Sequence, residues 1–220
     1  MFINLLDLLL LPTWESIYMV TLSTFFAIVL GAPIGIALVV WHESGLSPHR
    51  KWFVVLDGVV NVLRSFPFII LMILLFPLSR FIVGTTIGTT ATIVPLAIGA
   101  APFVARVVEG ALKEVDQGVI EAVIAMGTPL KDIVFKVLIL ESLPSLALGF
   151  TLTIINVIGY SAMAGAIGGG GLGDLAIRYG FHRFQTDVMI ASVVVIIVLV
   201  QGIQALGNYF SSRILKTRGL

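Results

Sequence analysis

Long stretches without charge alternate with short polar segments along this chain of 220 residues. About 20 consecutive apolar residues are needed for a helix to cross the hydrocarbon core of a bilayer. The pattern therefore predicts five membrane-spanning helices joined by polar connections. We expect these spans at about residues 16–41, 58–79, 88–108, 142–167 and 187–212.

Composition points to the same class of protein. Hydrophobic residues make up 58% of the chain and charged residues 11%, and the mean hydropathy is +1.10. A soluble domain carries about 25% charged residues, so this chain could not cover a water-facing surface of its own. The expected fold class is an all-α polytopic membrane protein, with residues 1–220 forming a single transmembrane domain.

Several function classes lose support from composition alone. The formal net charge is +1, which offers no basic patch for nucleic acid, and the absence of cysteine leaves no disulfide and no thiolate metal site. No metal or cofactor site is expected.

The distribution of lysine and arginine predicts the orientation in the membrane, because cytoplasmic connections carry an excess of these residues. Nine lie in one set of connections and three in the other, with Arg64 set aside as part of the second span. The N-terminus is therefore expected outside and the C-terminus in the cytoplasm. The nine are Arg50, Lys51, Arg106, Lys113, Lys131, Lys136, Arg213, Lys216 and Arg218, and the three are Arg80, Arg178 and Arg183.

The first residues, 2–11, are apolar enough to resemble part of a signal peptide. They lack a positive leader, include Asp7 and are not followed by a small-x-small cleavage site before the first span. We expect a short helix lying at the outer membrane interface.

Residues 113–137 form the most polar segment between spans and predict two short amphipathic helices joined by a corner. Gly127 suits the left-handed end of the first helix, Thr128 the cap of the second, and Pro129 its first position. Periodicity alone equally allows a solvated helical loop. The expected polar face comprises Glu114, Gln117, Glu121 and Thr128, the opposite face Val115, Val119, Ala122, Val123 and Met126, and the continuing apolar stripe Leu130, Ile133, Val134 and Val137.

Within this segment, the residues Glu121, Ala122, Val123 and Gly127 resemble the Glu-Ala-Ala-x3-Gly signature of permease subunits from bacterial ATP-binding-cassette importers. Val123 stands where the signature has its second alanine. The aliphatic residue that the family places ten positions after the glycine is matched by Val137. The Leu-Pro pair that follows in the family comes four residues late here, at residues 143–144.

Two more segments, residues 64–68 (Arg-Ser-Phe-Pro-Phe) and 159–173 (a Gly-Tyr-Ser-Ala-Met-Ala-Gly run leading into four glycines), are similar to the methionine-importer branch of that family. The resemblance implies a homodimer in a bacterial inner membrane, two ATP-binding subunits and a substrate-binding lipoprotein. It implies that Glu121, Ala122, Val123 and Gly127 couple to the ATP-binding subunit. It also implies a small amino acid as substrate, with methionine resting on the resemblance alone.

Enzymatic readings have little support in the sequence. No Gly-Lys dipeptide occurs, so there is no Walker A loop, and ATP hydrolysis would belong to the partner subunit. A dinucleotide-type glycine pattern at residues 168–173 follows an apolar run without β-α-β alternation and is better explained as a turn. Ser161 lacks the Gly-x-Ser-x-Gly context of a hydrolase.

Two groups of polar or soft side chains lie inside the spans. Asp57, Asn61 and Arg64 share a helix face, either as a structural ion pair or as the lining of a cytoplasmic vestibule. Tyr160, Ser161 and Met163, flanked by glycines, suit either close helix packing or the wall of a translocation pathway. An ion-coupled secondary carrier of small amino acids is the alternative function, although it would have no use for the cytoplasmic helical corner.

Overall fold

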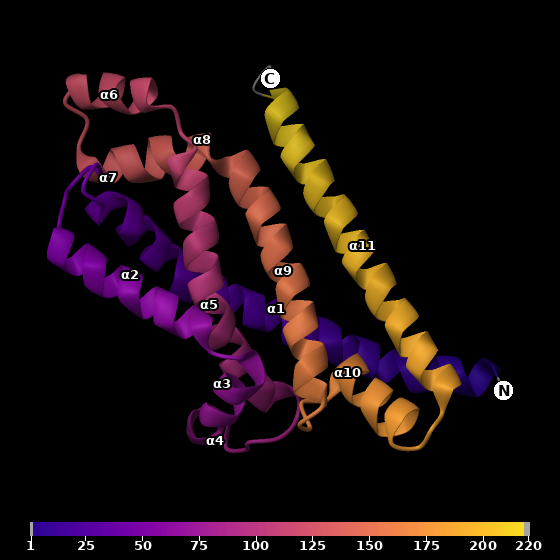
Figure 1. The fold of residues 1–220 in the computed structure, drawn as a ribbon. Helices are drawn as coiled ribbons and strands as arrows, with labels where there is room; N and C mark the ends of the chain where they lie inside the picture. Colours follow the sequence, from indigo (N-terminus) through magenta and orange to yellow (C-terminus); the bar gives the residue numbers. More distant parts are fainter. Residues whose placement is uncertain (1, 218–220) are drawn as a thin grey trace.

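The structure is a computed structural model that describes residues 2–217, with side chains described for residues 5–216. These residues form helices and connections without a strand, which confirms the all-α prediction (Figure 1). The elements in chain order are α1 (Phe2–Trp41), α2 (Arg50–Ser65), α3 (Phe68–Leu74), α4 (Phe76–Val83), α5 (Thr89–Lys113), α6 (Gln117–Ala125), α7 (Leu130–Asp132), the π-helix η1 (Ile133–Leu138), α8 (Ile139–Glu141), α9 (Leu143–Gly165), α10 (Gly171–Leu175), the π-helix η2 (Ala176–Phe181) and α11 (Thr186–Thr217).

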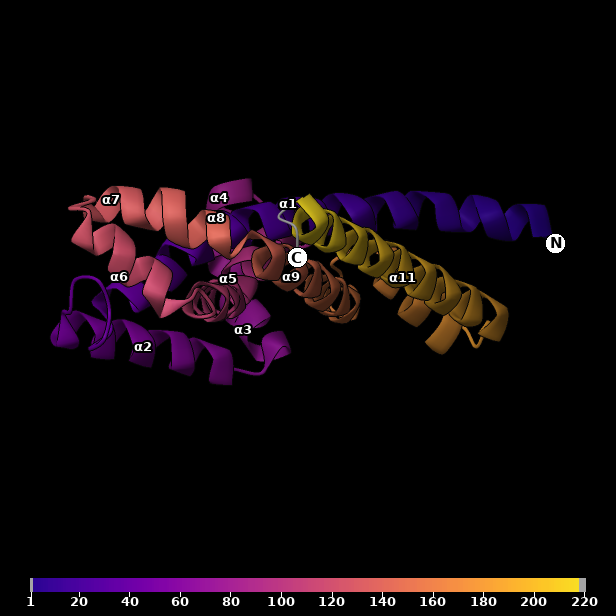
Figure 2. The ribbon, with the colours of Figure 1, turned by 90° about the horizontal axis from the view of Figure 1, so that it is seen from above.

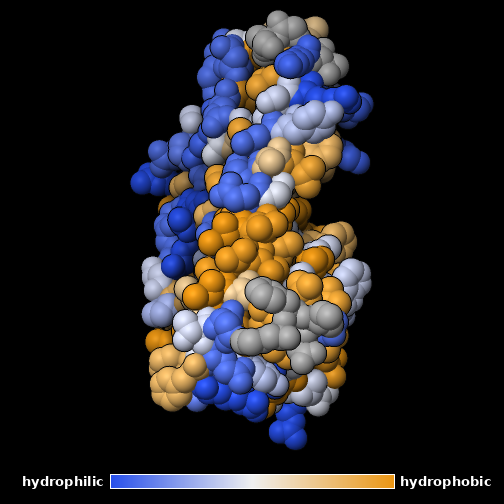
Figure 3. All heavy atoms as spheres, turned by 90° about the vertical axis from the view of Figure 1, so that its right-hand side faces the viewer, coloured by the Kyte–Doolittle hydropathy of each residue, from blue (hydrophilic) through white to orange (hydrophobic). Residues whose placement is uncertain are grey.

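Four of these helices, α1, α5, α9 and α11, are long and apolar enough to cross a membrane alone. The pair α2 and α3 passes the same test only when taken together, which brings the number to five. An apolar band crosses the face shown in Figure 3 between more polar regions at its two ends. This distribution is that of a protein whose middle lies in lipid.

The span expected at residues 58–79 is not one continuous helix. The chain bends by 104° between α2 and α3, and α4 follows as a further short helix. The bend occurs at Phe66, which is extended (φ −71°, ψ 131°), and Pro67. Proline disfavours a helical conformation in the residue before it and has no N–H to continue a helix.

Residues 2–11 are not a separate helix either, because they continue into the first span to form α1. At 1.5 Å per residue, the 40 residues of α1 extend about 60 Å, roughly twice the thickness of the hydrocarbon core. Figure 1 shows α1 running obliquely across the other spans. An oblique path lets one uninterrupted helix of this length contact several neighbours.

α5 is the central helix and the most extensively buried one. From above, α5 and α9 are seen almost end-on, with α1 and α2 on opposite sides (Figure 2). Glycines let α1 approach α5 closely: a Cβ on Gly31 would lie 2.7 Å from Cβ of Val104, and one on Gly35 would lie 2.8 Å from Cβ of Val108. Small residues four apart are a common means of close helix packing in membranes.

The remaining spans keep their expected places with shifted ends. α5 continues to Lys113, beyond the expected end at residue 108, because Arg106, Glu109 and Lys113 pair with one another along its last turns. Their charges end the apolar run in the sequence without ending the helix. The spans expected at 142–167 and 187–212 correspond to α9 and α11.

Candidate coupling site and translocation face

Residues 113–137, the candidate coupling segment, continue directly from the end of α5, where three residues, 114–116, lead into α6 (Figure 1). Asp116 caps α6, because its Oδ1 accepts a hydrogen bond of 2.7 Å from the backbone N–H of Gly118. The hydroxyl of Ser145 on α9 donates a hydrogen bond to the carboxylate of Glu114. The start of α6 is therefore held to α5 and α9 together.

Gly127 ends α6 in the left-handed conformation, with φ +74°, as the sequence predicted. The N–H of Gly127 donates to the carbonyl of Ile124 at 2.9 Å, and the N–H of Thr128 donates to that of Val123 at 3.2 Å. These two bonds form the motif in which a left-handed glycine closes a helix end. The predicted start of the next helix is one residue too early, since Pro129 occupies the N-cap position of α7.

The packed face of α6 differs from the predicted one. Only Ile120 and Val123 contact the hydrophobic core, and no residue of α6 is buried. Val119, Ala122 and Met126, expected on the packed side, are exposed. The core covers a single narrow stripe of this short helix, and periodicity in the sequence does not reveal how wide the covering surface is.

The opposite face of α6 consists of small side chains and one carboxylate. Gly118, Glu121, Ala122 and Ala125 are exposed and follow the spacing i, i+3, i+4 and i+7, which places them along one side of a helix. Small side chains allow a partner to approach the helix backbone closely, and Glu121 adds one directional contact. This face has the geometry of a docking surface.

The second half of the segment is anchored more firmly. Ile133 and Val134 are buried and Val137 is half-buried, whereas Leu130 is 41% exposed, so the predicted stripe holds except at its first residue. The buried pair lies at the start of the π-helix η1, whose wider turns change the direction of successive side chains from that of an α-helix.

The candidate pathway residues do not converge on one site. Tyr160 stacks on Phe68 of α3, with ring centroids 4.4 Å apart and an interplanar angle of 9°. Ser161 is buried and donates a hydrogen bond of 2.8 Å to the carbonyl of Ile158. Met163 is 47% exposed. At about 100° per residue, Ser161 faces the side of α9 opposite Met163. Tyr160 and Met163, three residues apart, are neighbours on the helix surface, but Phe68 covers Tyr160 and leaves Met163 exposed.

Met163 belongs to an exposed stripe on α9. Leu152 and Gly159 lie on the same face, at spacings of eleven and four residues from Met163, and both are exposed. A Cβ at Gly159 would meet no atom within 4 Å. This face of α9 therefore has room for another helix or for a small molecule.

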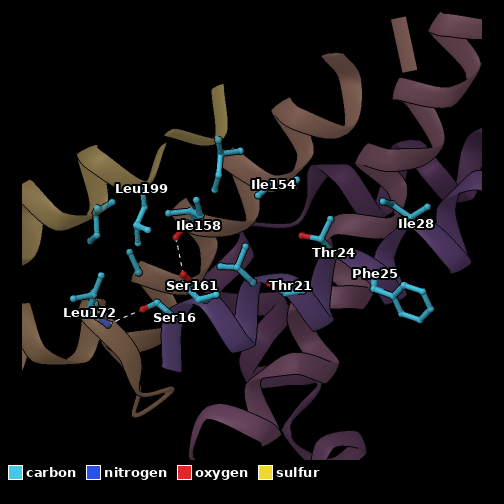
Figure 4. Close-up of a pocket in the computed structure, with 16 residues that line it drawn as sticks. Ser16, Thr21, Thr24, Phe25, Ile28, Ile154, Ile158, Ser161, Leu172 and Leu199 are labelled. Carbon is cyan, nitrogen blue, oxygen red and sulfur yellow. Dashed lines mark hydrogen bonds between the residues drawn. The ribbon is translucent and has the colours of Figure 1, made fainter. Parts of the chain in front are cut away.

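Ser161 instead lines a cavity of about 560 Å³ between α1, α9, α10 and α11 (Figure 4). No charged side chain lines it, and its polar groups are hydroxyls. The hydroxyl of Ser16 already accepts a bond from the N–H of Leu172 at 2.8 Å, and Thr24 Oγ1 is buried without a partner. A free amino acid carries two charges that this wall could not satisfy, so the cavity is unsuited to such a substrate.

The predicted polar face of α2 does form an ion pair, but its cation is Arg106 and not Arg64. Arg106 of α5 contacts Asp57 at 2.5 Å and Asn61 at 2.7 Å, whereas Arg64 is exposed at the end of α2. Arg64 lies seven residues from Asp57, about 10 Å along the helix axis, which is too far for a direct pair. The prediction of an ion pair holds, and the prediction of Arg64 as its cation is wrong.

Comparison with known proteins establishes the family. Residues 27–216 match the family described as binding-protein-dependent transport system inner membrane component. The chain belongs to this family. It is therefore the membrane-spanning component of a binding-protein-dependent transport system, a multi-pass protein with its spans in an inner membrane.

Similar proteins within this family are named as methionine permeases. The probable D-methionine transport system permease protein MetI of Vibrio cholerae is 48% identical over 208 residues, covering 94% of this chain and 92% of that protein. The methionine import system permease protein MetP of Bacillus subtilis is 45% identical over 200 residues, covering 91% and 90%.

Solved structures agree with this assignment. An inward-facing conformation of the MetNI methionine ABC transporter matches with a TM-score of 0.94 and 43% identity over 96% of this chain and 98% of that one. An amino acid ABC transporter solved with histidines matches with a TM-score of 0.74 and 21% identity, which shows a shared fold.

Some residues that organise this inner membrane component escaped the sequence analysis. Arg106, Glu109 and Lys113 recur at i, i+3 and i+7, a spacing that could have predicted an intrahelical ion pair. Asp116 immediately before an apolar helical run could have predicted the cap. The partner of Asp57 could not have been found in this way, because the contact with Arg106 joins residues 49 apart.

Proposed function

We propose that the chain is the permease subunit of an ATP-driven methionine importer, acting as a homodimer with two ATP-binding subunits and a substrate-binding lipoprotein. The observation that carries this proposal is the match to the MetNI methionine ABC transporter over nearly the whole of both chains. The permease makes and breaks no covalent bond itself, and ATP hydrolysis takes place in the partner subunits.

An ion-coupled carrier has less support. Ion-coupled carriers commonly bind the coupling ion at an acidic group within the membrane. Among the described residues, the buried carboxylate is that of Glu109, and Arg106 and Lys113 both pair with it.

The four motif residues have distinct parts in coupling. Glu121 and Ala122 lie on the exposed face of α6 and would contact the ATP-binding subunit. Val123 packs against the core and seats the helix, while Gly127 closes it. Because α6 follows α5 after only three residues and Glu114 in this connection is bonded to Ser145 of α9, displacement of α6 by the ATP-binding subunits would tilt α5. The spans would then alternate between inward-open and outward-open arrangements.

The exposed face of α9 around Met163 would form part of the pathway near the axis of the homodimer, with Tyr160 beside it and Ser161 on the opposite, cavity-facing side. Met163 offers a flexible, polarisable surface suited to a small apolar side chain.

Glu121→Lys should weaken association with the ATP-binding subunit by about tenfold or more, because it reverses the one charge on the docking face. Gly127→Val should have a similar effect, since a β-branched residue at φ +74° is strained by roughly 1–3 kcal/mol. Co-purification and ATP-driven uptake in proteoliposomes measure both effects. Gly110→Val is the matched control, because a Cβ there meets no atom within 4 Å. Normal assembly and uptake in both test variants would contradict the docking assignment.

We propose a cytoplasmic C-terminus and an external N-terminus, supported by the nine-to-three charge asymmetry and by the position of α6 at the same end of the molecule as the end of α11 (Figure 1). A topology reporter fused after Leu220 should give a cytoplasmic signal, and one inserted next to Arg183 should give an external signal. Reporters on the same side at both positions would refute the five-span topology.

A cysteine at Met163 should be cross-linked to its counterpart in the second copy in one nucleotide state, and the yield should fall when ATP or vanadate traps another state. The chain has no native cysteine, so the signal has no background. Ser161→Cys is the control and should stay unreactive, because this position is buried. A Met163→Cys thiol inert in every nucleotide state would show that this face is not part of the pathway.

A further inference from the structure

α2 has little apolar packing to hold it in place. Val60 is the buried side chain among its 16 residues. The bend of 104° at Phe66 and Pro67 also separates α2 from the direction of α3. Several of its larger apolar side chains are exposed, namely Trp52, Val54, Val55, Val59 and Val62. Within the single chain, apolar burial therefore holds this helix only at Val60 and the partly buried Phe53 and Leu56.

A closed polar triangle joins α2 to α5. The guanidinium Nη2 of Arg106 donates to Asp57 Oδ1 at 2.5 Å and to the side-chain oxygen of Asn61 at 2.7 Å. The side-chain nitrogen of Asn61 donates to Asp57 Oδ2 at 3.1 Å. All three side chains are therefore oriented by one another. Such a contact resists sliding and rotation, which apolar contacts alone permit.

The charges continue along α5 toward the coupling helix. Arg106 Nη1 pairs with Glu109 Oε2 at 2.6 Å, and Lys113 Nζ pairs with Glu109 Oε1 at 2.7 Å. The Glu109 side chain is only 8% exposed, so these ion pairs are weakly screened by solvent. Lys113 is the last residue of α5, four positions before α6 begins. The series thus extends from the middle of α2 to the base of α6.

We propose that Asp57 and Arg106 are positioning residues for transport: their ion pair makes α2 move together with α5 and α6, so that displacement of the coupling helix reaches the broken span α2–α3. This inference rests on the proposed function, since it assumes that an ATP-binding subunit moves α6. Loss of the pair leaves α2 free to lag behind α5. ATP hydrolysis then continues, and less substrate is moved for each ATP consumed.

The test uses the complete transporter, with its ATP-binding subunits, in proteoliposomes, with methionine as substrate. Asp57→Asn keeps the shape of the side chain and removes its charge, while Arg106 remains paired with Glu109. The ratio of methionine transported to ATP hydrolysed should fall by about fivefold or more, the lower end of typical coupling between distant sites. Asp57→Glu, which retains a carboxylate, should restore most of the ratio.

Glu43→Gln is the matched control. It removes an ion pair of 3.2 Å between Glu43 and Arg50 near the start of α2, where both side chains are largely exposed. Exposed pairs contribute little, so this variant should keep the wild-type ratio. An unchanged ratio in Asp57→Asn, or an equal loss in Glu43→Gln, would overturn the proposal.

A covalent link should replace the ion pair. Val60 of α2 and Ala105 of α5 are buried in one cluster. In the Asp57→Asn background, cysteines at both positions, joined as a disulfide or by a short bis-maleimide, should restore the ratio. Cleavage of the disulfide by reductant should lower the ratio again. If the cross-link forms but the transport ratio does not recover, the charge of Asp57 matters and the mechanical connection between α2 and α5 does not. This result would refute the positioning role.

The proposed function and the positioning role of Asp57 are refuted by different results. If the wild-type chain does not co-purify with an ATP-binding subunit, the proposed function is wrong. If the Asp57→Asn complex assembles and hydrolyses ATP at the wild-type rate with an unchanged transport ratio, the proposed function stands and the positioning role is wrong.

Discussion

The close contact between α1 and α5 is the constraint on which the rest of this structure depends. At Gly31 and Gly35 the two helices approach so closely that a methyl group would overlap valine side chains of α5. α9 and the segment α2–α4 also pack against α5, while α11 packs on α9 and η2. The C-terminal end of α5 leads into α6, so the helix that organises the membrane core also bears the segment with the family motif. Packing and the coupling that we propose therefore depend on the same element.

The ion pairs of α5 are grouped at one end of this helix. In a bilayer an unpaired charge is costly, and the described ion pairs of α5 are gathered along its last two turns. There the charged side chains neutralise one another, and Arg106 binds Asp57 of α2, a helix that has few buried side chains. The apolar cavity between α1, α9 and α11 shows the opposite arrangement, with hydroxyls and no charge. The ion pairs that join α2 to α5 thus lie toward α6, and the apolar cavity lies between α1, α9, α10 and α11.

Composition and the lengths of apolar runs were enough to predict an all-α membrane protein with up to five spans, since both follow from the cost of burying polar backbone in lipid. The corner at Gly127 was also predictable, because few residues other than glycine adopt its conformation. The direction of a helix was not predictable: Pro67 marks a possible break in the apolar run at 58–79, but the angle of 104° cannot be derived from the sequence. The packed face of α6 and the partner of Asp57 depend on segments far away in the sequence, and local periodicity contains no such information.

Thermal unfolding of a Gly31→Leu variant, assembled with its ATP-binding subunits, tests the central role of the α1–α5 contact most directly. Leucine at this position must displace Val104 or separate the helices, so the complex should lose stability by roughly 1–3 kcal/mol and unfold at a lower temperature. Gly58→Leu on α2, where a Cβ meets no atom within 4 Å, should unfold at the wild-type temperature or above it. A Gly31→Leu complex with wild-type stability would show that α1 is not held by this contact and would contradict the account.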